Sequence, residues 1–267
     1  MSVAAPLDEA LEPLRSEPSR AAVLLDVDGT LAPIVRHADD AHVPEPTRAQ
    51  LIQVAKRYGL VACVSGRQAA IARRIVSLGT ITYVGNHGAE ILRGGATEVE
   101  RDPEIVAWGR RVSDFAHRAM NDELRRLRVR EEDKDVIAAL HWRGAPDEDA
   151  AEQAVLAVAA DAEAAGFLIH RGRKVLEIRP PIAIDKGRGV TRLLAEFDLD
   201  AAVYVGDDVT DLDAFGALRA LRDEGRLTTA VCVGVESDET PPEIERGADL
   251  LVPGPAGVRE LLTTLVA

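Results

Sequence analysis

Residues 21–30 read AAVLLDVDGT, and this stretch decides the fold class. Its short apolar run, stopped by Asp26 and Gly29, predicts a strand that is buried on both faces. Asp26 and Asp28 follow that strand directly, where like charges repel each other and burial adds a desolvation cost. A divalent cation would relieve both effects. Taken alone, the pair fits equally well with a strand-end turn that carries two solvated aspartates.

Short apolar runs like this one recur along most of the chain. Short apolar runs alternate with segments of helical apolar spacing, which predicts an α/β fold with a parallel sheet covered on both faces. The other expected strands are 60–64, 81–85, 203–206, 228–235 and 250–252. The expected helices are 6–15, 46–58, 68–76, 186–196, 211–222 and 255–266.

Residues 94–179 have a different pattern of apolar and charged residues, which predicts a smaller α+β unit inserted into this core. The insert holds a charged helix over 103–127, an alternating strand VIAALHWR and an alanine-rich helix over 148–165. FLIHR and KVLEIR follow, joined by Gly172 and Arg173, and are typical of a hairpin. We therefore expect residues 1–93 and 180–267 to form the core and residues 94–179 to form a cap.

Composition narrows the classes of partner. The 267 residues carry a formal net charge of −13, which disfavours nucleic acid and anionic membranes. The polar N-terminal segment predicts no secretory signal, and no apolar run is long enough for a membrane span. Cys63 and Cys232 lie in apolar runs and are expected to be buried thiols, so we expect a cytoplasmic protein. The sequence makes no prediction of oligomeric state.

Three further polar clusters are expected at the carboxyl ends of strands, where sites form in parallel sheets. Ser65 and Gly66 follow the second strand, and a hydroxyl at a helix N-terminus can bind phosphate. Lys186 opens a helix and could neutralise a phosphate. The GDDVTD segment at 206–211 supplies hard carboxylate oxygens, which suit magnesium at a phosphoryl-transfer site. Each cluster alone also fits an ordinary helix start or a solvated surface.

These residue types match a specific chemistry. Asp26 is placed to attack phosphorus and form an aspartyl-phosphate. Asp28 is placed to protonate the leaving alkoxide and then to activate water. Gly29 permits a sharp turn, after which backbone amides can hold phosphate oxygens. The four clusters together therefore predict a phosphatase.

The four clusters stand in the order of the motifs of the haloacid dehalogenase-like (HAD) phosphatases, and their wording resembles the trehalose-6-phosphate phosphatases. DVDGTLAPIV, VSGR, GNHGAE, EIRP followed by DKGRGV, and YVGDDVTDLDAF carry the resemblance over roughly residues 21–216. Leu212 departs from it, where an acidic residue is usual. The resemblance implies a HAD-like Rossmann-type core with a C2-type cap. It also implies Mg²⁺-dependent hydrolysis of trehalose 6-phosphate in trehalose biosynthesis.

The resemblance also implies roles for individual residues. Asp26 is the nucleophile and a magnesium ligand, and Asp28 is the acid/base whose backbone carbonyl also meets the metal. Asp207 is the remaining direct carboxylate ligand. Asp211 supports the metal site directly or through water, and Asp208 is a less certain member. The residues implied for the phosphoryl group are Ser65, Gly66 and Lys186.

Sugar recognition needs hydrogen-bonding groups from both core and cap. The candidates are Arg67, Asn86 and His87 from the core, and Lys134, His141, Arg143, Lys174 and Glu177 from the cap. Strand alternation puts His141 and Arg143 on one face, whereas Lys174 and Glu177 are three residues apart and do not share one. Each cap residue fits a solvated strand face equally well.

Two other functions remain open at this level. The same mechanism could serve another sugar phosphate, such as a mannosylglycerate-type phosphate or the phosphate of a trehalose-like pseudo-disaccharide. A retired phosphatase domain could instead bind and regulate a sugar-synthesising partner. Asp26, Asp28, Lys186 and Asp207 are all present, which disfavours the second possibility.

Overall fold

The computed structural model describes residues 4–35, 40–133, 136–237 and 240–267. The chain forms two compact units, one comprising Met1–Glu100 with Ile184–Ala267 and the other Arg101–Ala183. Among the described residues, no helix combines the length and the apolar character needed to cross a bilayer. Each unit has hydrophobic clusters of its own.

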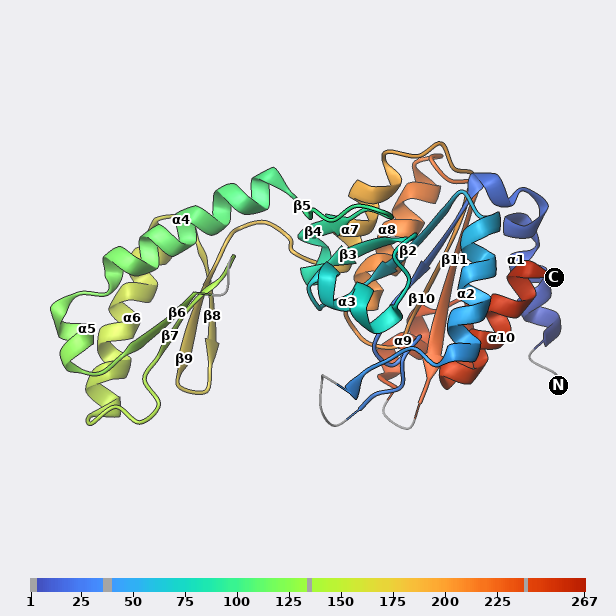
Figure 1. Ribbon diagram of the computed structural model, residues 1–267. Helices are drawn as coiled ribbons and strands as arrows, with labels where there is room; N and C mark the ends of the chain where they lie inside the picture. Colours follow the sequence, from blue (N-terminus) through green and yellow to red (C-terminus); the bar gives the residue numbers. More distant parts are fainter. Residues whose placement is uncertain (1–3, 36–39, 134–135, 238–239) are drawn as a thin grey trace. The chain divides into compact units, whose positions relative to one another are not determined.

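The larger unit is built on an eight-stranded sheet of order β12-β11-β10-β1-β2-β3-β4-β5 (Figure 1). Its strands are β1 Ala21–Leu25, β2 Leu60–Val64, β3 Thr82–Gly85, β4 Glu90–Leu92, β5 Glu100–Arg101, β10 Ala201–Gly206, β11 Thr229–Glu236 and β12 Leu250–Pro253. The strands from β12 to β3 are parallel, which confirms the predicted sheet. β4 runs antiparallel to β3, and neither β4 nor β5 was predicted because both are very short.

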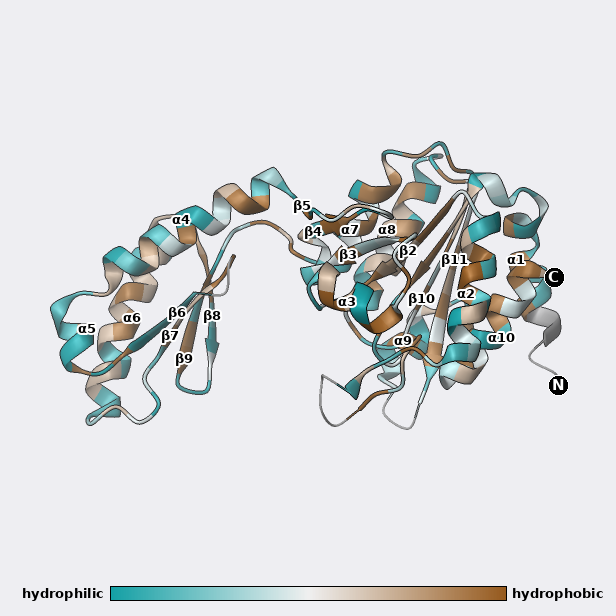
Figure 2. Cartoon of the chain, viewed as in Figure 1, coloured by the Kyte–Doolittle hydropathy of each residue, from teal (hydrophilic) through white to brown (hydrophobic). Residues whose placement is uncertain are grey.

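Helices cover both faces of this sheet, and most of its strands are strongly apolar (Figure 2). One face packs against α1 Ala4–Ser16, α2 Glu45–Arg57, α3 Ala69–Val76 and α10 Gly254–Val266. The other face packs against α7 Lys186–Leu194, α8 Asp211–Asp223 and α9 Pro242–Gly247. The predicted helices are present with small shifts at their ends, and α9 was not predicted.

The smaller unit is a four-stranded antiparallel sheet of order β6-β7-β9-β8, with helices on one face. Its strands are β6 Arg130–Asp133, β7 Ala138–His141, β8 Leu168–Gly172 and β9 Val175–Arg179. Its helices are α4 Pro103–Ala119, α5 Asp122–Arg126 and α6 Glu148–Ala164. The predicted hairpin is β8–β9. The sequence did not predict β6, whose charged residues hide the strand pattern.

Two expectations for this unit were wrong in detail. The helix predicted over 103–127 is interrupted at Met120 and Asn121, because the Asn121 side chain accepts a hydrogen bond from the amide of Leu124 at 2.9 Å and starts a new helix. The strand predicted over VIAALHWR includes only β7. It ends at His141, so strand alternation does not extend to Arg143.

Candidate active site

Asp26 lies directly after β1, which pairs with β2 and β10 inside the eight-stranded sheet. Its amide donates to the carbonyl of Val205 at 2.8 Å, so β1 and β10 stay paired up to the carboxyl group. Asp26 has the same strand parity as Leu24 and therefore faces the side of α7 and α8. The side chain is buried, with 4% of the residue exposed. The Asp26 carboxylate therefore points to the side of the sheet on which α7 and α8 pack.

Lys186, the first residue of α7, joins two of the carboxylates. Its ammonium donates to Oδ1 of Asp26 and to Oδ1 of Asp211, both at 2.7 Å. Burial alone would lower the pKa of Lys186, but Asp26 and Asp211 outweigh burial and raise it. The lysine therefore stays protonated and holds the two carboxylates in one buried ion-pair cluster.

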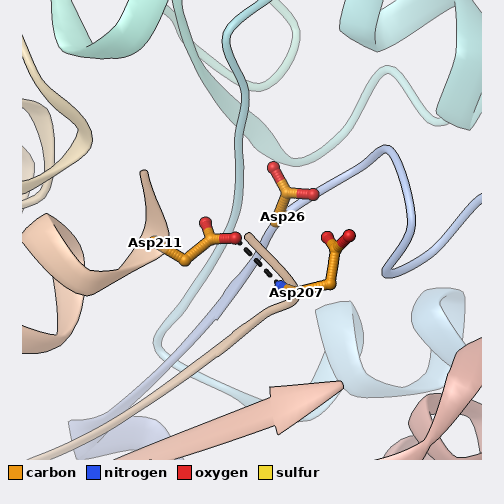
Figure 3. A group of neighbouring side chains, drawn as sticks. All are labelled: Asp26, Asp207 and Asp211. Atoms are coloured by element: carbon orange, nitrogen blue, oxygen red, sulfur yellow. Dashed lines mark hydrogen bonds between the residues drawn. The ribbon is translucent and has the colours of Figure 1, made fainter. Parts of the chain in front are cut away.

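A third carboxylate completes an acidic cluster beside this lysine. Ligand oxygens of Asp26, Asp207 and Asp211 lie within 4.8 Å of one another (Figure 3). Burial, and then the charge of Asp211, raise the pKa of Asp207 to about 6. Burial and Asp211 likewise raise the pKa of Asp26 above its usual range. The negative charge exceeds what one ammonium offsets, so the donor set fits a hard divalent cation.

Two glycines make room for the aspartates of the GDDVTD segment. A Cβ at Gly29, whose φ is +85°, would collide with the carboxyl group of Asp207. A Cβ at Gly206 would collide with that of Asp211. The hydroxyl of Thr30 donates to Oδ1 of Asp207 at 3.1 Å and orients it. Gly206 and Thr30 lie inside the GDDVTD and DVDGT segments, but no role was predicted for either from the sequence.

Asp211 is fully buried and accepts four hydrogen bonds. Lys186 and the hydroxyl of Tyr204 donate to Oδ1, both at 2.7 Å. The amides of Asp207 and Asp208 donate to Oδ2 at 2.9 and 3.1 Å. A carboxylate offers about four lone-pair sites, so these four donors saturate it. This arrangement favours Asp211 as a support of the site rather than as a direct metal ligand.

Asp28 lies at the mouth of the site and forms an ion pair with Arg67. The guanidinium donates to both carboxylate oxygens, each at 2.7 Å. The two residues line a cavity of about 400 Å³ in the larger unit. The other lining residues are Ile34, Val35, Asp207, Asp208, Ser237 and Pro241. The cavity thus reaches from the acidic cluster to an apolar wall.

The GNHGAE segment holds the loop that carries Ser65. The amide of Asn86 donates to the carbonyl of Arg67 at 2.8 Å, and the amide of His87 donates to that of Ser65 at 3.2 Å. The buried carboxylate of Glu90 accepts from the amide of Ala69, the first residue of α3, at 2.7 Å. Glu90 lies within a motif quoted above but was not assigned a role.

His87 has a specific place beside this loop. Its backbone has a positive φ of 53°, and its ring occupies the space that a Cβ at Gly66 would need. Burial, and then the charge of Lys186, lower the pKa of His87 below its ordinary value. The structure therefore brings Asp26, Asp28, Ser65, Gly66, Arg67, Asn86, His87, Lys186, Asp207 and Asp211 together in the larger unit.

The cap candidates separate into two groups. His141 and Glu177 share the sheet face opposite the one on which Leu140 and Leu176 pack, since Ala139 pairs with Glu177. The imidazole Nε2 of His141 is 2.8 Å from Oε2 of Glu132.

Arg143 and Lys174 instead lie at the hairpin end of the cap sheet. Arg143 donates to the carbonyl of Arg173 at 3.1 Å, and Lys174 forms an ion pair with Glu148 at the start of α6. Lys134 lies outside the described residues. The structure therefore does not group the four described cap candidates on one surface.

The parallel sheet, the aspartates after its central strand and the inserted four-stranded cap define a HAD-like hydrolase fold with a C2-type cap. The trehalose-phosphatase family model matches residues 24–242. The chain belongs to the trehalose-phosphatase family.

Relatives and solved structures agree with that family. A trehalose-phosphate phosphatase of Mycobacterium avium is 32% identical over 255 residues, covering 87% of this chain and 63% of the relative. A probable trehalose-phosphate phosphatase of rice (Oryza sativa subsp. japonica) is 33% identical, covering 77% and 57%. The trehalose-6-phosphate phosphatase structure of Aspergillus fumigatus, crystal form 3, superposes with a TM-score of 0.70 at 22% identity, covering 100% of this chain and 97% of that one. This structural likeness establishes the fold alone.

The chain is shorter than the curated relatives it matches. It spans between half and two thirds of the two trehalose-phosphate phosphatases above. It spans only 15% of an uncharacterized glycosyl hydrolase of Mycobacterium tuberculosis, to which it is 33% identical over 210 residues.

Proposed function

We propose that this chain hydrolyses trehalose 6-phosphate to trehalose and phosphate. The cluster formed by Asp26, Lys186, Asp207 and Asp211 is the observation that carries the proposal. It combines a buried carboxylate nucleophile, a fixed ammonium and hard oxygen ligands, which are the parts that phosphoryl transfer needs. Membership of the trehalose-phosphatase family supports this choice of leaving group.

In the proposed reaction, a carboxylate oxygen of Asp26 attacks phosphorus, the bond to the sugar oxygen breaks, and an aspartyl-phosphate forms. In the substrate complex, one Asp28 oxygen would carry a proton from solvent in place of its contact with Arg67. Asp28 gives that proton to the departing sugar oxygen and then takes one from the water that hydrolyses the intermediate, which releases phosphate and restores Asp26. The ion pair with Arg67 fixes the orientation of the Asp28 carboxyl group. Lys186, Ser65 and the amides around Gly66 would hold the phosphoryl oxygens.

The donor set also supports a magnesium site. Asp26, Asp207 and the backbone carbonyl of Asp28 would hold the ion, with Asp211 acting through the amides and the lysine that it binds. When bound, Mg²⁺ would neutralise charge on the transferring phosphoryl group. Hard carboxylate oxygens beside a phosphate are the usual setting for magnesium.

The inserted unit would act as the cap that recognises the sugar. His141 and Glu177 are the best-supported contacts, because they share one face of the cap sheet, although His141 also pairs with Glu132 and Glu177 with Arg179. Lys174 and Arg143 are weaker candidates, since both lie at the hairpin end of the cap sheet, where Arg143 contacts Arg173 and Lys174 contacts Glu148 of α6. From the core, Arg67, Asn86 and His87 would reach the phosphate-bearing ring.

A panel of sugar phosphates tests the leaving group. We expect kcat/KM for trehalose 6-phosphate to exceed that for glucose 6-phosphate, a mannosylglycerate-type phosphate and a pseudo-disaccharide phosphate by at least about tenfold. A higher value for any other member of the panel would refute the proposed substrate while leaving the phosphatase mechanism standing.

Asp26→Asn tests the nucleophile. Turnover should fall by at least about 10³-fold while circular dichroism and Tm remain those of a folded protein. Asp198→Asn is the matched control, because Asp198 is a solvent-exposed aspartate that pairs with Arg20. The control should keep wild-type turnover. Normal activity of Asp26→Asn would remove Asp26 from the role of nucleophile.

A further inference from the structure

Tyr204 is a fully buried tyrosine in the middle of β10. The chain has three tyrosines, and all of them are buried. The hydroxyl groups of Tyr58 and Tyr83 donate to backbone carbonyls. That of Tyr204 donates to Oδ1 of Asp211 at 2.7 Å. Tyr204 is therefore the one tyrosine whose phenol contacts the acidic cluster.

Packing alone does not explain why this position carries a tyrosine. The ring packs edge-on against Phe215, with centroids 5.8 Å apart, inside the apolar cluster between the sheet and the α7–α8 side. A phenylalanine ring would make the same apolar contacts. Burying a hydroxyl costs free energy unless it finds a partner. The partner here is Asp211, so the role of the hydroxyl must be sought in what Asp211 does.

Asp211 connects the two sides of the candidate site. Its Oδ1 holds Lys186, which also contacts Asp26. Its Oδ2 holds the amides of Asp207 and Asp208, and so fixes the turn from which Asp207 projects. Without the phenol, Oδ1 keeps only Lys186, and the carboxyl group gains freedom to rotate. Rotation would disturb the lysine and the turn together.

We propose that Tyr204 is a positioning residue whose hydroxyl holds the Asp211 carboxylate in the orientation that places Lys186 and the Asp207–Asp208 turn. The kinetic part of this inference rests on the proposed phosphatase function. The fully buried hydroxyl of Tyr204 acts on the site through Asp211, so its loss should affect kcat and spare KM. The structural part concerns the protein without substrate.

Tyr204→Phe tests the inference in two independent ways. We expect kcat to fall by about tenfold with KM within about twofold of wild type, because a hydrogen bond to a charged group is lost. We also expect the amides of Asp207 and Asp208 to exchange with solvent about tenfold faster, measured residue by residue by NMR without substrate. Amides elsewhere in β10 should exchange at wild-type rates after correction for global stability.

Tyr83→Phe is the matched control. Tyr83 is a fully buried tyrosine of the same sheet, and its hydroxyl donates to the carbonyl of Leu78 at 2.5 Å. The Tyr83→Phe variant should have a lower Tm, but its kcat and the exchange rates of the Asp207 and Asp208 amides should equal those of wild type. An equal effect of both variants, or unchanged exchange at these two amides in Tyr204→Phe, overturns the inference. If the wild-type chain does not hydrolyse trehalose 6-phosphate, the proposed function fails, but the exchange comparison still decides the role of Tyr204.

Discussion

Replacing Asp207 by asparagine should stabilise the metal-free protein and remove its response to magnesium. In the absence of a cation, the half-buried carboxylate of Asp207 is crowded by Asp211, and its pKa is raised from 3.8 to about 6. Because one pKa unit corresponds to about 1.4 kcal/mol, this shift represents a penalty of about 3 kcal/mol before solvent screening. Partial exposure of the group reduces it to about 1–2 kcal/mol.

The pH window follows from the direction of the shift. The folded state binds a proton at Asp207 more tightly than the unfolded state does, so the carboxylate destabilises the fold increasingly as pH rises from about 4 to about 6. The penalty is fully present above that window and absent below it. Asp207→Asn should therefore raise Tm in EDTA at pH 8 by about 3–6 °C and lose this advantage near pH 4.

At pH 8, magnesium should make wild type more stable to heat than the Asp207→Asn variant, the reverse of the order expected in EDTA. Wild type gains about 2.7 kcal/mol when Mg²⁺ is present at a hundred times its Kd, whereas the asparagine variant lacks a charged ligand and gains little. Differential scanning fluorimetry with EDTA and with Mg²⁺ measures both effects. Asp198→Asn is the control, because Asp198 is exposed and its ion-pair partner is Arg20 rather than a member of the cluster. A variant that is less stable than wild type in EDTA, or that responds equally to Mg²⁺, would refute the reasoning.

Two further substitutions test the geometry around the cluster. Gly29→Ala should lower the Mg²⁺ affinity measured by calorimetry, because its Cβ would collide with Asp207. Gly95→Ala is the control, since Gly95 has a similar positive φ but open space around it, and this variant should lower stability alone. Equal Mg²⁺ affinity of the two variants would contradict the prediction. Glu90→Ala should weaken competitive inhibition by inorganic phosphate. The Ala69 amide would lose its acceptor, and the preceding loop, which carries the proposed phosphate ligand Ser65, would be held less firmly. Glu90→Gln should restore it, and failure of that rescue would count against a positioning role.

Much of the core could be predicted because local patterns and site chemistry agree there. The run before Asp26 is apolar without interruption, and it forms a strand that is buried on both faces. The helix that begins at Lys186 was predicted from its first residue. The strand before Asp26 and the helix start at Lys186 both depend on residues close in sequence, so one sequence without an alignment is enough to locate them.

The partners of individual side chains could not be predicted in the same way. Tyr204 looked like one more apolar strand residue, because its hydrogen bond to Asp211 depends on how α8 packs on β10. Lys174 is a candidate sugar contact, and its ion pair with Glu148, 26 positions earlier in the chain, could not be predicted from the sequence either. Tertiary packing decides these contacts, and no periodicity in the sequence reports it.

The charge balance of the site explains why a cation and a phosphate belong together there. The protein is acidic overall, with a net charge of −13, so an anionic substrate must be attracted locally. Among the residues that the structure describes, Lys186 and Arg67 are the basic groups in contact with the site's aspartates, and they provide no surplus of positive charge. Lys186 is shared between Asp26 and Asp211, and Arg67 is paired with Asp28.

Of the described residues, a phosphoryl group would meet the two cations and the four carboxylates of Asp26, Asp28, Asp207 and Asp211, with the carboxylate of Asp208 also lining the cavity. A divalent ion held by Asp26 and Asp207 would offset the two charges by which those four carboxylates exceed the two cations, before any substrate bound. The substrate phosphate should therefore bind more tightly to the magnesium-loaded protein than to the metal-free one. By linkage, phosphate should raise the Mg²⁺ affinity by the same factor.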